Sequence, residues 1–97
     1  FSITGNIGST SVSSTVSVTL NGNQDSVTEV TLERSSDGGN SYRDYLTLES
    51  KSSSKASYTV SASESGLSSA YDYRVKAALY VYDDAGNEIE YDCIYLD

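Results

Sequence analysis

Hydrophobic and polar residues alternate along most of the chain with a period of two. In residues 14–20, for example, Val16, Val18 and Leu20 alternate with Ser and Thr. Successive side chains of a strand point to opposite faces, so such runs predict strands with one buried face. The clearest runs are residues 14–20, 28–34, 42–49, 56–62, 71–82 and 88–96. No segment shows a period near 3.6 residues, so no helix is predicted.

The segments between these runs have the composition of turns and connections. "NGN" (21–23) and "SDGGN" (36–40) hold residues that tolerate positive φ, and residues 50–57 and 63–69 are rich in serine. The glycine- and serine-rich opening, residues 1–14, predicts a short, irregular edge strand. About seven strands at this spacing predict an all-β antiparallel sandwich, formed by a single domain over residues 1–97.

The terminal hairpin, residues 71–97, holds six of the nine tyrosines. We expect the five-residue loop "DDAGN" to close it, because an odd loop makes the apolar faces of its two strands coincide. The predicted pairs are Val81 with Ile89, Leu79 with Tyr91, Ala77 with Cys93 and Val75 with Tyr95.

This register divides the terminal tyrosines into two groups. Those expected to face the core, together with Cys93, are Tyr71, Tyr73, Tyr91 and Tyr95. Tyr80 and Tyr82 are expected to face outward beside Glu88 and Glu90, and these four residues form the predicted binding site. Exposed aromatic side chains with polar neighbours are typical of contact surfaces. Ordinary cross-strand packing on a half-exposed sheet is the alternative explanation.

The charge and the single cysteine narrow the range of partners. A net charge of −8 and a pI near 4.2 argue against nucleic acid and anionic membranes as partners. No apolar run reaches the length of a membrane span, so no membrane insertion is expected. Cys93 is the only cysteine, which excludes an internal disulfide. A start at Phe1 rather than Met suggests a processed or excised chain, and we expect an extracellular or cell-surface location.

The residues that catalysis requires are not arranged for it. The chain has no histidine to activate a serine or Cys93. Glu88, Glu90 and Asp92 lie two apart along one strand, but a flat sheet face offers no cleft around them. We therefore expect that the protein is not an enzyme and that it uses no cofactor. Oxygen donors near Asp83 and Asp84 lack EF-hand spacing, so a turn is favoured over a metal site; weak Ca²⁺ binding there is left open.

One stretch carries a family resemblance. "GLSSAYDYRVKA" (66–77) resembles the next-to-last strand of fibronectin type III and immunoglobulin-like sandwiches, and "LERSSDGGNSYRDY" (32–45) resembles their central hairpin. The resemblance implies an immunoglobulin-like sandwich with Tyr71 as its tyrosine corner. The whole chain is similar to small secreted β-sandwich proteins of unknown function from Gram-positive gut bacteria. A core Trp, a disulfide pair, a Pro and an Arg-Gly-Asp motif are absent.

These observations favour a non-catalytic, extracellular binding or adhesion module. Its partner would be a protein or a glycan, bound through the outer face of the terminal hairpin. One alternative is a self-assembling subunit of a bacterial surface filament, in which the opening segment pairs with a neighbour's sheet edge. Another is a carbohydrate-binding accessory domain of an enzyme.

Overall fold

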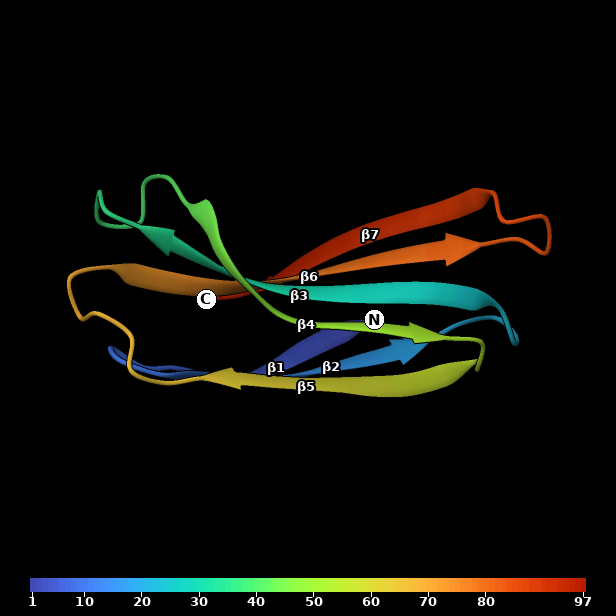
Figure 1. Ribbon diagram of the computed structural model, residues 1–97, viewed down its shortest axis with the longest axis horizontal. Helices are drawn as coiled ribbons and strands as arrows, with labels where there is room; N and C mark the ends of the chain where they lie inside the picture. Colours follow the sequence, from blue (N-terminus) through green and yellow to red (C-terminus); the bar gives the residue numbers. More distant parts are fainter.

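Seven strands and no helix make up the computed structural model, which describes residues 1–97 (Figure 1). The chain therefore contains no helix of the length and apolarity that a membrane crossing requires. The strands are β1 (Ser2–Ile7), β2 (Val12–Thr19), β3 (Asp25–Ser35), β4 (Arg43–Ser53), β5 (Ser57–Glu64), β6 (Asp72–Tyr82) and β7 (Glu88–Leu96).

The strands form two antiparallel sheets that lie face to face (Figure 1). One sheet has the order β1-β2-β5 and the other has the order β4-β3-β6-β7. The predicted all-β antiparallel sandwich of about seven strands is confirmed, and the arrangement is compatible with an immunoglobulin-like sandwich. The molecule is elongated, with extents of 45 × 20 × 16 Å.

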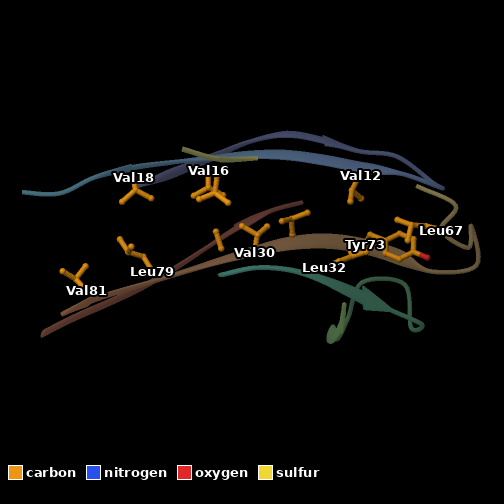
Figure 2. Close-up of a cluster of buried hydrophobic side chains, with 12 residues drawn as sticks. Val12, Val16, Val18, Val30, Leu32, Leu67, Tyr73, Leu79 and Val81 are labelled. Carbon is orange, nitrogen blue, oxygen red and sulfur yellow. The ribbon is translucent and has the colours of Figure 1, made fainter. Parts of the chain in front are cut away.

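The core lies between the two sheets and is built from the period-two pattern. Along β2 every second residue is buried, and its valines, including Val16 and Val18, point toward β3 and β6 (Figure 2). Leu32, Val75 and Leu79 meet them from the opposite sheet. Burying such β-branched and aliphatic side chains supplies most of the stabilisation of the fold.

A buried polar cluster also joins the sheets. The hydroxyl of Tyr58 on β5 lies 2.8 Å from both Ser26 Oγ and Thr28 Oγ1 of β3. Ser26 and Thr28 are buried, and these bonds satisfy their hydroxyls. The cluster fixes one tyrosine ring between the layers.

The opening segment forms an edge strand, as predicted, although its pairing is regular rather than irregular. β1 pairs with β2 over six consecutive residue pairs. Gly5 has φ of +149°, and a Cβ there would collide with the backbone of Ser13. Glycine is therefore required for β1 to approach β2 this closely.

The turn between β6 and β7 is the predicted five-residue loop, but the register beyond it is not the predicted one. Tyr82 pairs with Glu88 across the loop. The ladder then shifts at a bulge, so that Glu90 rather than Ile89 pairs with Val81. The following pairs all move by one residue: Leu79 with Asp92, Ala78 with Cys93, Ala77 with Ile94, Lys76 with Tyr95 and Val75 with Leu96.

The bulge turns most of β7 over and corrects three predictions. Tyr91, Cys93 and Tyr95 lie on the outer side of the sheet instead of in the core. Tyr91 and Tyr95 are 54% and 45% exposed, and Cys93 is half-buried. Ile94 and Leu96 take the inner side and pack against the core. Aliphatic side chains bury no hydroxyl, which explains why they occupy that side.

The tyrosine whose hydroxyl returns to the upstream backbone is Tyr73, and not Tyr71 as predicted. The hydroxyl of Tyr73 donates a 2.7 Å hydrogen bond to the backbone oxygen of Ser68, five residues upstream. Tyr73 is buried in the core, as predicted, whereas Tyr71 is half-buried at its margin. Tyr71 precedes the first residue of β6, Asp72, whereas Tyr73 lies within the strand and shares its inner side with Val75.

Candidate recognition face

The outward side of the sheet β4-β3-β6-β7, here called the outer face, collects aromatic and charged side chains. Alternation and register place the members of this face on all four strands. Its members away from the hairpin turn include Asp44, the bulged Tyr45 and Thr47 of β4; Glu29, Thr31 and Glu33 of β3; Arg74, Lys76, Ala78 and Tyr80 of β6; and Tyr91, Cys93 and Tyr95 of β7. Side chains from the two edge strands, β4 and β7, therefore contribute to the same surface.

An ion cluster fixes one part of the outer face. Arg74 Nε lies 2.5 Å from Glu33 Oε1, and Lys76 Nζ lies 3.4 Å from Glu33 Oε2. Lys76 also contacts Asp44 Oδ1 at 3.0 Å. The Glu33 side chain is only 7% exposed, so both of its cations are needed to compensate for its loss of water.

The cluster perturbs the protonation of its members. A hydrogen bond and charge interaction with Asp44 raise the pKa of Lys76, with Glu33 contributing further. The neighbouring Lys76 ammonium lowers the pKa of Asp44 through a hydrogen bond and through its charge. Both shifts favour the charged forms of Lys76 and Asp44.

Arg74 is also held between two aromatic rings. Its guanidinium carbon lies 4.3 Å from the ring centre of Tyr42 and 4.2 Å from that of Tyr95. Cation–π attraction acts at these distances and adds to the ion pair with Glu33. Arg74 is therefore restrained by the Glu33 carboxylate and by the rings of Tyr42 and Tyr95.

A shallow hollow of about 340 Å³ lies beside this cluster. Its floor includes Thr31 and Ala78, which are buried, and short side chains at these positions leave space above the sheet. Its other lining residues come from β3, β4, β6 and β7: Glu29, Asp44, Tyr45, Leu46, Thr47, Lys76, Tyr80 and Tyr91. The hollow is therefore an aromatic and ionic surface rather than an apolar pocket.

Tyr80 and Tyr91 stand together at the hollow. Their ring centres are 5.1 Å apart and their planes are inclined by 53°, which is a favourable tilted aromatic pair. Further along β7, the Cys93 thiol interacts with its neighbours on both sides. The interaction with Cys93 is the main reason that the pKa values of Tyr91 and Tyr95 are raised.

The structure keeps Tyr80, Tyr82 and Glu88 of the predicted binding site on the outer side of the sheet, whereas the bulge turns Glu90 to the inner side. Tyr80 lies at the hollow, and Tyr82 pairs with Glu88 at the turn end of the hairpin. Glu90 pairs with Val81 and lines a different hollow with Leu20 and Gln24, near the end of β2. Tyr80 and Glu90 therefore do not share a surface.

Tyr45, Tyr91 and Glu29 belong to the outer face but were missed by the reasoning from sequence. Glu29 carried a usable signal, because it alternates with the buried Val30 and Leu32. Tyr91 was assigned to the core through the unshifted register. For Tyr45, a bulge in the pairing of β3 with β4 also obscured the pattern.

Two aspartates, Asp83 and Asp37, accept hydrogen bonds within turns. Asp83 Oδ1 accepts hydrogen bonds from the backbone N–H groups of Asn87 and Ala85, at 2.8 and 3.0 Å. Hydrogen bonds from Asn87 are the main reason that the pKa of Asp83 is lowered. Asp37 accepts from the side chains of Ser35 and Ser41 in the β3–β4 turn, and these bonds lower its pKa strongly. Such side-chain-to-backbone bonds are a standard role of Asp in turns.

The side chains of the outer face can stack on flat groups and form hydrogen bonds. Its rings offer stacking surfaces, while its carboxylates and hydroxyls accept or donate hydrogen bonds. No group of three or more His, Cys, Asp and Glu side chains converges in a way that would hold a metal ion. Comparisons with protein-family models, with curated proteins and with solved structures find no match for this chain.

Proposed function

We propose that this protein is a non-catalytic recognition module that binds a partner through its outer face. The observation that carries this proposal is the group of exposed tyrosines around a hollow on an ordered sheet. Tyr45 and Tyr91 are 46% and 54% exposed. Exposed aromatic side chains of this kind supply large contact areas at a low cost in side-chain entropy.

The order of the surface supports the same function. Glu33 is tied to Arg74 and Lys76, and the Arg74 guanidinium is stacked between Tyr42 and Tyr95. Side chains that are already restrained lose little freedom when a partner binds, which increases affinity for a given contact area. A merely solvated sheet face has no need of such a network.

We further propose that the fold is that of a fibronectin type III or immunoglobulin-like domain acting outside the cell or at its surface. The division of the strands into β1-β2-β5 and β4-β3-β6-β7 supports this. The hydroxyl of Tyr73 returns to the backbone upstream of β6, which is the tyrosine corner of that architecture. Fold likeness carries no partner, so the partner follows only from the outer face.

The test is binding to defined peptide and glycan arrays, with sedimentation to detect self-association. The double variant Tyr80→Ala with Tyr91→Ala removes the aromatic pair, and Tyr82→Ala is the matched control on the same hairpin. We expect ligands that bind the unaltered protein to be lost by the double variant and kept by the control. Binding that survives the double variant, or the absence of any array ligand, would contradict the proposal. Concentration-dependent mass sensitive to the double variant would instead indicate the filament alternative.

A further inference from the structure

We propose that the hollow between Tyr80, Tyr91 and Glu29 receives an arginine side chain from a basic protein partner. This inference rests on the proposed function and gives the chemical class of its ligand. It is argued from the way in which the protein binds its own cations and from the charge around the hollow.

The outer face already contains a site of this kind, occupied by Arg74 of the chain itself. The guanidinium lies between the rings of Tyr42 and Tyr95, at 4.3 and 4.2 Å, while Nε contacts a Glu33 carboxylate oxygen. The flanking rings and the carboxylate together satisfy both the faces and the charge of the planar guanidinium cation.

The hollow presents the same groups, and its one internal cation, Lys76, is already paired with Glu33 and Asp44. Tyr80 and Tyr91 supply the rings, and Glu29 supplies the carboxylate from the neighbouring strand β3. No Lys or Arg of the chain stacks on Tyr80 or Tyr91, and Glu29 forms no salt bridge. Ala78 lies between them on the floor, where its small side chain leaves room for a guanidinium.

The charge of the hollow also favours a cation. Its one cation, Lys76, is neutralised by Glu33 and Asp44, so Glu29 leaves the hollow with excess negative charge. The whole chain carries a net charge of −8. Charge of one sign around a binding site attracts and steers a partner of the opposite sign.

The geometry of the rings favours arginine over a sugar. Tyr80 and Tyr91 are inclined by 53° to each other, so they form a corner instead of a flat stacking platform. A guanidinium needs only one exposed ring face for stacking, and its N–H groups can reach a carboxylate at the same time. A glycan remains the alternative outcome of the experiment.

The experiment is a titration followed by NMR, using the tripeptide acetyl-Gly-Arg-Gly-amide as the probe. The matched ligand is the same peptide with citrulline, which keeps the shape of arginine but is uncharged. We expect saturable shifts of the backbone amides of Ala78, Tyr80 and Tyr91 with the arginine peptide. Binding of the citrulline peptide should be at least about two- to five-fold weaker, because both the ion pair and the cation–π attraction are lost.

Variants of the protein then test the assigned residues. Glu29→Gln and Tyr91→Ala should each weaken arginine-peptide binding by about two- to five-fold. Glu88→Gln removes the same charge as Glu29→Gln from the turn end of the sheet, and we expect it to change affinity by less than that. Both charge variants are conservative changes at exposed sites, so folding is retained.

The outcomes separate this inference from the proposed function. Equal binding of the arginine and citrulline peptides, or equal effects of Glu29→Gln and Glu88→Gln, would overturn the arginine assignment. If cellohexaose shifts the amides at Tyr80 and Tyr91 while the arginine peptide does not, the arginine assignment fails and the recognition face stands. If neither these probes nor any array ligand nor self-association perturbs the outer face, both proposals fail.

Discussion

The two faces of the sheet β4-β3-β6-β7 arise from the same alternating pattern, but they are stabilised by different interactions. Its inner side presents aliphatic residues such as Leu32 and Leu79, which are almost completely buried. Its outer side presents tyrosines and ions, with Glu33 buried under Arg74 and Lys76. The inner side is held by loss of water from apolar surface, whereas the outer side is held by directional contacts. A strand residue can therefore be ordered without belonging to the core.

Truncation of the inner side should produce the largest effect. Leu32→Ala should lower the free energy of unfolding by about 2–5 kcal/mol, because it leaves a cavity between the sheets. Thr47→Ala, at an exposed outer position of β4, should lower it by less than about 0.5 kcal/mol. Urea unfolding of both variants measures the contrast. Similar losses from the two variants would show that the two faces do not differ as described.

The outer side should show its own dependence on Glu33. Glu33→Gln should cost about 1.5–3 kcal/mol in the free energy of unfolding, because two cations lose a charged, nearly buried partner. Asp44→Asn is the control, since the Asp44 side chain is 63% exposed, and it should cost less than about 1 kcal/mol. Urea unfolding again provides the measurement. A neutral effect of Glu33→Gln would mean that the ion cluster does not stabilise the outer face.

The tyrosine corner connects the inner side to the loop before β6. Tyr73→Phe should cost about 1–2 kcal/mol, because the backbone oxygen of Ser68 loses a hydrogen bond of 2.7 Å. Tyr71→Phe should cost much less, since the Tyr71 hydroxyl makes no hydrogen bond to the protein. The difference in urea midpoint between these two variants tests the corrected assignment, and a reversed order would restore Tyr71 as the corner.

The sequence was sufficient to predict most of the fold because burial and alternation coincide in β2, β3 and β6. Val16, Val30 and Val75 were all expected on buried faces, and all are fully buried. Even the five-residue turn closed by Tyr82 and Glu88 was predicted correctly. These features depend on local turn chemistry and on strong apolar alternation.

The register of β7 was not predictable in the same way. Its two faces are similar in hydropathy, because Tyr91, Cys93 and Tyr95 compete with Ile94 and Leu96 for the core. The half of β7 nearest the turn contributes little to that choice, since Glu90 and Asp92 stay exposed even opposite inner residues. A single bulged residue, Ile89, then reverses the strand. The outer face, and therefore the candidate site, depends on this bulge.

The contribution of Asp37, in the β3–β4 turn, to thermal stability should change with pH only in the acid range. Hydrogen bonds from Ser35 and Ser41 hold the pKa of Asp37 well below its usual range. A carboxylate with a lowered folded-state pKa stabilises the protein above its unfolded-state pKa, and that stabilisation is lost as pH falls. Asp37→Asn should therefore lower Tm at pH 7, and the difference from the unaltered protein should shrink as pH falls below about 3.8. Thermal unfolding from pH 7 to pH 2 measures this, and a constant difference would contradict it.

The smallest effect on stability is expected at the exposed residue Tyr91. Its neighbour Cys93 provides the sharpest test of the register of β7. Tyr91→Ala should lower the free energy of unfolding by less than about 1 kcal/mol, because the ring is 54% exposed. Cys93 lies on the same side of β7, half-buried beside Tyr91 and Tyr95, so it should react with a thiol reagent in the native protein. Tyr91→Ala should increase that rate by uncovering the thiol, whereas Tyr82→Ala, at the turn end, should leave it unchanged. If native Cys93 reacted only after denaturation, the thiol would face Ala77 in the core. The unshifted register would then hold, and Tyr91 would leave the outer face together with the hollow built around it.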